Sequence, residues 1–427
     1  MDKTRSAWRF IVFSAIGFFV FFIPVNWKGS SSIPLDHIVS WIRTNLTSFA
    51  LLYAVAVTTV GGLLPWVNGS WRKSKVDTVF SVFKLAGILI AFMVYFKIGP
   101  AWMMESSMGP FLFEKLVVPV GLIVPVGSVF LAFLIGYGLM EFVGTFLRPM
   151  MRLIWKTPGK SAIDAIASFV GSYSIALLIT NRVFKEGKYT IKEAAIIATG
   201  FSTVSATFMI IVAKTLNLMD MWNTYFWSAL VVTFAVTAVT ARIWPLSRKP
   251  DSYATEPNPE KEISTSIAVA WEEALKAAAD APGILESIAK NIRDGFRMAA
   301  SILPTIMSIG LLGLVLANYT PIFDFIGWIY YPFMLLLRVP EPVLASKAAA
   351  VEVAEMFLPA LLTANAPLVT RFVTAIVSIS AILFFSASIP CILSTEIPLT
   401  ITEIIVIWIE RTIFSIVFAA ILAMILL

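Results

Sequence analysis

The sequence predicts an all-α integral membrane protein made of two inverted repeats, each of which contains a re-entrant helical hairpin. Hydrophobic residues make up 59% of the 427 residues and charged residues only 14%, whereas a soluble protein carries about 25% charged residues. The mean hydropathy is +0.87. Two similar segments, GSYSIALLITN (171–181) and EMFLPALLTAN (355–365), each interrupt an apolar stretch with polar residues or proline. Paired broken helices in corresponding halves are typical of solute carriers.

Long apolar runs alternate with shorter amphipathic pieces along the chain. A helix rises 1.5 Å per residue, so about 20 apolar residues cross the hydrocarbon core of a membrane. We expect transmembrane helices at 8–26, 46–66, 77–96, 117–143, 190–213, 222–246, 297–317, 367–393 and 401–426. The shorter pieces lie at 144–157, 161–182, 322–338 and 343–365.

Basic residues mark alternate loops, and this pattern sets the orientation of the chain. They occur before the first span and after the second, the fourth and the span that ends near 246, at Lys3, Arg5, Arg9, Arg72, Lys73, Lys75, Arg148, Arg152, Lys156, Lys160, Arg248 and Lys249. Lys and Arg accumulate in cytoplasmic loops. We therefore expect a multi-pass protein of a bacterial or archaeal cytoplasmic (inner) membrane, with its N-terminus in the cytoplasm. No small-residue cleavage site follows the first apolar run, so we expect that run to be a retained span.

The segment 161–182 is long enough to cross the membrane once, but the charges around it predict a hairpin. Basic residues flank it on both sides, from Arg148 to Lys160 and from Arg182 to Lys192. A full crossing would carry the second group outside and reverse every later loop. A re-entrant hairpin keeps both groups in the cytoplasm. Its non-helical tip at 171–174 must then be buried in protein or face water.

Several residues recur in the same order in both halves, although a chance match of apolar residues is the alternative explanation. Pro149 corresponds to Pro332, Thr157-Pro158 to Val339-Pro340, and LLITN (177–181) to LLTAN (361–365). The first half starts from outside and the second from the cytoplasm, which makes the repeats inverted. The predicted parts are three N-terminal helices at 1–116, a first repeat at 117–246 with a hairpin at 161–182, a cytoplasmic linker with two short amphipathic helices at 247–296, and a second repeat at 297–427 with a hairpin at 343–365.

Motifs for catalysis or nucleic-acid binding are missing from the sequence. Gly159-Lys160-Ser161 resembles the end of a P-loop, but the earlier glycine is replaced by Ile154. His37 is the only histidine and Cys391 the only cysteine, which excludes a His-based metal centre and a disulfide framework. The net charge of +6 comes from basic residues beside apolar segments, as in membrane loops. We expect no enzyme activity, no cofactor and no nucleic-acid partner.

Acidic residues at membrane depth are the strongest candidates for function, because a charge there is costly unless it is paired or hydrated. Glu355 lies at the predicted break of the second hairpin, four residues before Pro359. Its carboxylate could bind a substrate ammonium group, coordinate Na⁺ or exchange a proton, or it could be a structural acid held by backbone N–H groups. Glu352 lies one helical turn earlier and is either its partner in ion coupling or unrelated. Glu410-Arg411 predict a local ion pair or a contact with a neighbouring span.

Hydroxyl groups gather at the first hairpin tip and in the spans that follow each hairpin. Hydroxyls at a helix break suit a polar substrate group, although they can equally cap the half-helix or bond the preceding turn. The candidates for substrate binding, beside Glu355, are Gly171, Ser172, Tyr173, Ser174, Ser202, Thr203, Ser205, Ser378 and Ser380. The candidates for coupling Na⁺ or H⁺ are Glu355, Glu352 and Thr207.

Three stretches carry a resemblance to a known family: GFSTVSATF (200–208), YTPIFDFIGWIYYPF (319–333) and VAEMFLPALLTAN (353–365). They resemble the Gate, or nucleoside-recognition, domain, most closely that of the bacterial YjiH-type membrane proteins, and the likeness covers roughly 117–427. Gate domains also occur in concentrative nucleoside transporters and in ferrous-iron transporters. The resemblance implies a concentrative-nucleoside-transporter-like fold, with two re-entrant hairpins and two broken spans around one central site. It also implies Na⁺ or H⁺ coupling and an elevator-like motion.

One departure from the family bears on the solute. In nucleoside transporters an acidic and amide pair that reads ribose would fall on the broken span of the second half. This chain has Ser378 and Ser380 there instead. The solute therefore stays open among an amino acid, a dipeptide and a nucleoside-like molecule.

The sequence thus predicts a secondary transporter of a small polar solute, acting as a homo-oligomer in the lipid bilayer. Glu355 would take a cationic group or a coupling ion, and the first hairpin an anionic or hydroxylated end. A structural or assembly protein of the same family, which binds no solute, is the alternative. An intramembrane enzyme is the weakest interpretation, because the sequence offers neither a base nor a metal set.

Overall fold

The computed structural model shows a protein that is helical over its described residues, apart from one small pair of strands. The residues that it describes are 3–27, 30–72, 75–106, 108–159, 161–162, 165, 168, 173–204, 206–257, 266–386, 388–393 and 395–427.

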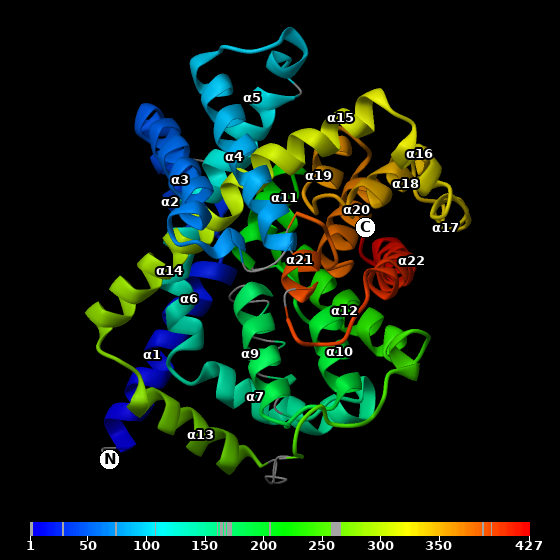
Figure 1. Ribbon diagram of the computed structural model, residues 1–427. Helices are drawn as coiled ribbons and strands as arrows, with labels where there is room; N and C mark the ends of the chain where they lie inside the picture. The colour runs from blue at the N-terminus through cyan, green and yellow to red at the C-terminus, as the bar shows by residue number, and fades with distance from the viewer. Residues whose placement is uncertain are drawn as a thin grey trace.

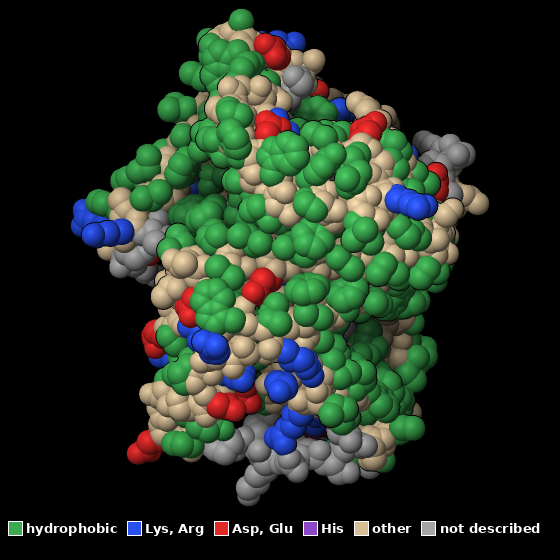
Figure 2. Space-filling model, turned by 90° about the vertical axis from the view of Figure 1, so that its right-hand side faces the viewer, with side chains coloured by type: hydrophobic (Ala, Val, Ile, Leu, Met, Phe, Trp, Pro, Cys, Tyr) green, Lys and Arg blue, Asp and Glu red, His purple; other side chains and the backbone are tan. Residues whose placement is uncertain are grey.

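Seven of the helical stretches in the described residues are long and apolar enough to cross a membrane, so the chain is a multi-pass membrane protein. They are Thr4–Phe22, Thr47–Val67, Asp77–Phe96, Ala101–Phe130, Met219–Thr240, Ile284–Tyr319 and Ile401–Leu426. Figure 2 shows hydrophobic side chains over most of the middle of one face, with charged side chains gathered mainly below them. Leu336 is 80% exposed and Phe325 70%. Large apolar side chains exposed together in this way are expected where lipid replaces water.

The N-terminal part forms one flank of the molecule (Figure 1). It contains a short antiparallel strand pair between its first two helices, which the all-helical prediction did not include. Its elements are α1 (Lys3–Phe22), β1 (Val25–Trp27), β2 (Ser30–Ser32), α2 (Pro34–Asn45), α3 (Thr47–Val67), η1 (Ser70–Arg72), α4 (Lys75–Phe96), η2 (Ala101–Met104) and α5 (Gly109–Phe111).

The first repeat begins with a π-helical turn and contains one broken helix. Its elements are η3 (Leu112–Val117), α6 (Val118–Ile135), α7 (Leu139–Met150), η4 (Met151–Trp155), α9 (Tyr173–Lys185), α10 (Ile191–Gly200), α11 (Ala206–Thr215), η5 (Met219–Met221), α12 (Trp222–Thr240) and η6 (Leu246–Arg248). The expected span at 117–143 is shifted toward the N-terminus, because its helix begins at Gly109 and runs through α5, η3 and α6. It ends at Ile135, because the chain turns at Gly138, which adopts a left-handed φ of 103°.

The linker and the second repeat follow. Their elements are α13 (Ile267–Asp280), α14 (Ile284–Thr305), η7 (Ile306–Gly310), α15 (Leu311–Tyr319), α16 (Ile322–Gly327), α17 (Tyr331–Leu336), α18 (Pro342–Val351), α19 (Leu358–Leu362), α20 (Leu368–Ser380), α21 (Ser388–Leu393) and α22 (Ile401–Leu426). The linker holds one separate amphipathic helix, α13, and not two. The second expected helix is continuous with the following span from Ile284 to Tyr319, although Pro304 and the π-helix η7 lie within this stretch.

Both repeats present their described elements in the same order: a long helix, a short kinked helix, a hairpin helix, a broken helix and a closing span. The backbone repeats in detail as well. Lys156 and Arg338 precede the two paired Pro motifs, and both adopt a left-handed φ, 56° and 54°. One residue more separates Pro149 from Thr157 than separates Pro332 from Val339. The π-helix η4 absorbs that residue, since a π-turn takes one residue more than an α-turn.

Several basic residues lie on one side of the molecule, here called the basic side. They are Arg148, Lys185, Lys192 and Lys249. Salt bridges join Arg148 to Glu273 (2.8 Å), Lys185 to Glu396 (2.7 Å) and Lys249 to Glu403 (2.7 Å). In Figure 1, α7, α13 and the N-terminus all lie at the bottom, opposite α5. The chain before Ser161 and the chain after Lys185 therefore meet the same side, as a re-entrant segment requires. The hairpin tip at 171–172 is outside the described residues.

Helices α3 and α4 approach α14 so closely that only glycine fits at the contact. A Cβ atom at Gly61 would lie 1.6 Å from the Ala300 carbonyl oxygen, and one at Gly87 would lie 1.9 Å from that of Pro304. Small residues permit such backbone contact between membrane helices. The N-terminal helices are thus fastened to α14, which forms a wall of the site described below.

We predict that Gly87→Ala lowers the stability of the protein, because the new methyl group must push α4 away from α14. The loss should be about 1–3 kcal/mol, as for other overpacked contacts, and is measured as a fall in the thermal unfolding temperature in detergent micelles. Gly283→Ala is the control, since nothing lies within 4 Å of its Cβ position. Equal unfolding temperatures for both variants would show that α4 and α14 are not in this contact.

Candidate functional site

The second hairpin is unwound between α18 and α19, at residues 352–357. Pro359, in the first turn of α19, has no N–H to continue a helix from the preceding residues. Glu355 replaces part of the missing helical bonding. Its Oε2 accepts the backbone N–H of Phe357 at 2.6 Å, and the side chain is buried, with 3% exposed. The acid therefore caps α19, which was one of the two roles expected from the sequence.

The broken helices meet this unwound segment and each other. The backbone N–H groups of Phe385 and Ser386 donate to the carbonyl oxygens of Val353 (2.7 Å) and Ala354 (3.0 Å), so the break after α20 pairs with the hairpin tip. Thr203 Oγ1, in the break between α10 and α11, donates to the carbonyl of Ile379 at 3.0 Å. These bonds satisfy backbone groups that lipid cannot satisfy.

A fully buried arginine on α22 binds the ends of both broken helices. Arg411 Nε and Nη2 donate to the carbonyl oxygen of Ser380, the last residue of α20, at 3.1 and 2.7 Å. Its Nη1 donates to Thr237 Oγ1 at 3.1 Å. That hydroxyl lies 2.7 Å from the carbonyl of Gly200, the last residue of α10, and equally near that of Thr233. A cation suits both places, because carbonyl oxygens at a helix C-terminus carry partial negative charge.

Glu352 is held by a tryptophan of α22, and both Glu355 and Arg411 act on it electrostatically. Trp408 Nε1 donates to Glu352 Oε2 at 2.5 Å, and Arg411 attracts the carboxylate electrostatically. Glu352 is completely buried, and its Oε1 has no hydrogen-bond partner among the described residues. Although Glu352 and Glu355 are three residues apart, the unwound backbone sends them into two different environments.

Glu355 lines a small space, here called the inner cavity, of about 20 Å³. That volume is enough for one water molecule or one small ion. The walls come from the break of the first repeat, from α11, from α14 with η7, and from the break of the second repeat. They are Val204, Phe208, Met298, Ile302, Thr305, Ile306, Glu355, Met356, Phe384 and Ser386.

The candidates from the sequence lie in different places. Of those that the structure describes, Glu355 alone lines the inner cavity. Ser378 and Ser380 instead donate to the carbonyls of Thr374 and Ile376 one turn earlier in their own helix, at 2.8 Å each. Ser202 and Thr207 are buried. Ser202 Oγ has no partner among the described residues.

The remaining candidates belong to the first hairpin and the first break. Tyr173 and Ser174 begin α9, although their side chains are outside the described residues. Gly171, Ser172 and Ser205 are themselves outside the described residues. It therefore stays a prediction that the first hairpin binds an anionic or hydroxylated group of the solute while Glu355 binds a cationic group.

Arg411 is the residue that sequence reasoning undervalued. No salt bridge to Glu410 is present within the described residues; Arg411 turns inward and contacts the neighbouring spans, the second of the two expected possibilities. A usable signal was available: an arginine inside a 26-residue apolar helix is as costly as a buried acid. Thr237 offered no comparable signal, because hydroxyls are common in membrane helices.

The groups around the inner cavity are all oxygen-bearing or apolar. The carboxylate of Glu355 and the hydroxyls of Ser386 and Thr305 are the ligand type that hard cations such as Na⁺ prefer. They could also carry a proton. Nothing in this arrangement resembles a nucleophile with an adjacent base.

Comparison with known proteins gives a domain and a relative. Residues 117–219 match the family model Gate, described as nucleoside recognition. A protein of Alkalihalophilus pseudofirmus with the name "Uncharacterized protein BpOF4_10220" is 32% identical over 440 residues, which cover 96% of this chain and 93% of the relative.

Two solved structures of variants of CNTnw also match. One, in the intermediate 1 state, is 14% identical with a TM-score of 0.45 and covers 99% of both chains. The other, in an outward-facing state, is 12% identical with a TM-score of 0.48, and covers 99% of this chain and 97% of its own.

We predict that Arg411→Met destabilises the protein strongly, because the Ser380 carbonyl and the Glu352 carboxylate lose their buried cation. Removing one partner from a buried charged group typically costs about 3–5 kcal/mol. The thermal unfolding temperature in detergent reports the loss.

Adding Glu352→Gln to Arg411→Met should recover part of that stability, since the buried negative charge is gone. Arg297→Met, on an exposed part of α14, should change little. A double variant that is no more stable than Arg411→Met alone would contradict the coupling between Arg411 and Glu352.

Proposed function

Because this chain belongs to one family with the Alkalihalophilus pseudofirmus protein and carries the Gate (nucleoside recognition) domain, we propose that it is a secondary transporter of a small polar solute. The observation that carries the proposal is the Glu355 carboxylate, buried at the unwound tip of a hairpin and facing a cavity between the two repeats. A buried acid at a helix break has a clear use as a site that binds a cation and releases it.

We propose that Glu355 binds the coupling ion, Na⁺ or H⁺, or an ammonium group of the solute. The size of the inner cavity, about 20 Å³, supports an ion or a water in this closed state. A solute would need the walls to separate. The candidates for the solute are an amino acid, a dipeptide or a nucleoside-like molecule, and the description of the Gate domain favours the last of these.

We propose an elevator-type motion for alternating access. The second hairpin and the broken helix α20–α21 are joined by backbone hydrogen bonds at Val353 and Ala354, so they can move as one unit. The opposite wall, α14, is fastened to α3 and α4 through Gly61 and Gly87. Sliding the first unit along the second would open the inner cavity to one side and then to the other.

We propose further that the basic side faces the cytoplasm and that the chain acts as a homo-oligomer in the cytoplasmic membrane of a bacterium or archaeon. The charge pattern supports the orientation, because Lys and Arg favour cytoplasmic loops. The N-terminus lies on that side too, since Arg9 Nη2 donates to the carbonyls of Ala281 and Pro282 next to α13.

A structural or assembly role without transport is the second candidate. The observation that favours it is the same small cavity, which has no room for an organic solute in this conformation. The two candidates differ in a measurable way, because an assembly protein binds no solute and is not stabilised by one.

We predict that Glu355→Gln reduces coupled uptake at least about tenfold, because the amide cannot carry the charge that binds the ion. The measurement is uptake into proteoliposomes of amino acids, dipeptides and nucleosides under imposed Na⁺ and pH gradients. Thermal-shift screening with and without Na⁺ first selects the solute.

Glu272→Gln on the exposed face of α13 is the matched control and should transport like the wild type. Uptake by the Glu355→Gln variant equal to wild type at every pH and Na⁺ concentration would reject Glu355 as the ion site. A flat screen across all three solute classes would favour the assembly role.

A further inference from the structure

A second and larger cavity lies away from the basic side, between the N-terminal part and the first repeat. Its volume is about 290 Å³, close to the lower end of the range for small-molecule sites. Helix α2 contributes Asp36 and Arg43, the η3–α6 helix contributes Lys115, and α11 contributes Lys214 and Thr215. We call this space the outer cavity.

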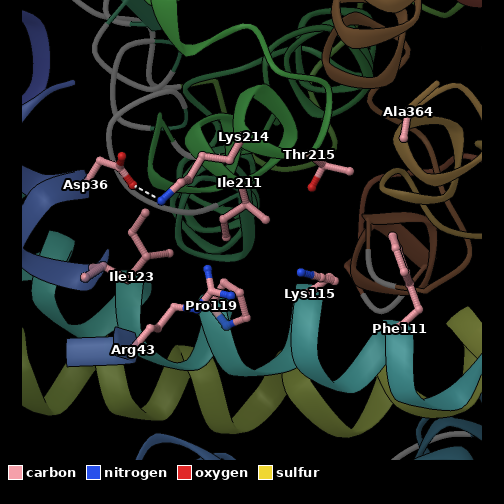
Figure 3. Close-up of a pocket in the computed structure, with 11 residues that line it drawn as sticks. Asp36, Arg43, Phe111, Lys115, Pro119, Ile123, Ile211, Lys214, Thr215 and Ala364 are labelled. Atoms are coloured by element: carbon pink, nitrogen blue, oxygen red, sulfur yellow. Dashed lines mark ion pairs between the residues drawn. The ribbon is translucent and has the colours of Figure 1, made fainter. Parts of the chain in front are cut away.

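The outer cavity is electropositive. Figure 3 shows the side chains of Arg43, Lys115 and Lys214 reaching into the space between the η3–α6 helix and α11. Asp36 is the only acid among the described residues that line it; its Oδ1 lies 2.5 Å from Lys214 Nζ and neutralises that lysine. Asp36 also accepts the hydroxyl of Ser32 at 2.9 Å, so it is held in place.

Arg43 and Lys115 remain as cations with no ion pair to a described residue. Arg43 is half-buried, and burial lowers the pKa of its guanidinium, while Asp36 and Glu114 act to raise it. Glu114 lines a neighbouring cavity of about 370 Å³ that shares Arg43. Even with Glu114 counted, the cations outnumber the acids, so the region favours an anion.

One face of α11 runs from the outer cavity to the inner cavity. Thr215 and Ile211 line the outer cavity, and Phe208 lines the inner one. Residues separated by three, four or seven positions share a helix face. From Thr215 to Phe208 the helix advances about 10 Å. The two cavities therefore lie along the same face of α11, with Ile211 and Phe208 between Thr215 and the site of Glu355.

We propose that the outer cavity is the first binding site of the transported solute and that it binds the solute's carboxylate or phosphate group through Arg43 and Lys115. This inference rests on the proposed transport function and narrows it. An uncharged nucleoside has no group that requires two unpaired cations, whereas an amino acid, a dipeptide or a phosphorylated solute has one. Arginine gives planar, bidentate recognition of either anion.

The test measures equilibrium binding to the purified full-length protein in detergent free of phospholipid. The probes are inorganic phosphate, succinate and, as a neutral molecule, uridine. We expect phosphate or succinate to bind with an affinity that falls as NaCl rises, and we expect Arg43→Gln and Lys115→Gln each to weaken it about tenfold or more. Lys115 is exposed, so its variant keeps the test valid if the Arg43 variant does not fold.

Lys97→Gln is the control, because Lys97 is an exposed lysine that does not line the outer cavity. It should bind the anions like the wild type. Absence of anion binding, or equal weakening by all three variants, would overturn the proposal. So would stabilisation by phosphatidylglycerol in nanodiscs without any response to the free anions, because the site would then hold a lipid headgroup.

The binding test of the outer cavity and the transport test of Glu355 can fail independently of each other. Anion binding that depends on Arg43, together with no uptake of any solute into proteoliposomes, would keep the outer cavity as a binding site and reject the carrier. Uptake that depends on Glu355, together with anion binding unchanged in both variants, would keep the carrier and reject the outer cavity.

Discussion

One buried guanidinium holds the centre of this protein together. Two helices stop in the middle of the molecule, and the carbonyls at their ends have no water to bind. Arg411 satisfies Ser380 directly and reaches Gly200 through Thr237. Glu352, which Trp408 holds in place, attracts the guanidinium electrostatically without forming an ion pair with it among the described residues. Without this group, the Ser380 carbonyl would lose its side-chain donors, and Thr237, which bonds Gly200, would lose its link to α22.

The same constraint separates the structural acid from the functional candidate. Glu352 accepts a hydrogen bond from Trp408 of α22, whereas Glu355 accepts the N–H of Phe357 just before α19 and faces the inner cavity. A hairpin that is unwound over a few residues can therefore place two carboxylates in two different roles. The outer cavity adds a region of opposite charge along α11. An anionic group held there and a cationic group or ion held at Glu355 would be arranged along one helix face.

The sequence predicted the structure best at residue types that are rare in membrane-spanning segments. Composition predicted the membrane helices, and the polar breaks predicted the unwound tip at Glu355, because both depend on the cost of polarity in lipid. The turn at Gly138 and the continuity of α14 depend on packing and were not readable from apolar runs. Ser378 and Ser380 looked like site residues, but hydroxyl groups bond the turn before them as readily as a ligand. The double role of Arg411 needed coordinates, since Gly200 and Ser380 lie far apart in the chain.

The long helix from Ile284 to Tyr319 has a mechanical consequence. Its 36 residues extend about 54 Å at 1.5 Å per residue, whereas the hydrocarbon core is about 30 Å thick. The rod must therefore tilt steeply or project into water, and its amphipathic first turns suit the aqueous end. Ile302, Thr305 and Ile306, which wall the inner cavity, lie near the middle of the rod. Pro304 lies among these residues and weakens the helix there, so a change of tilt at the end that carries Ile284 would bend the helix at that wall.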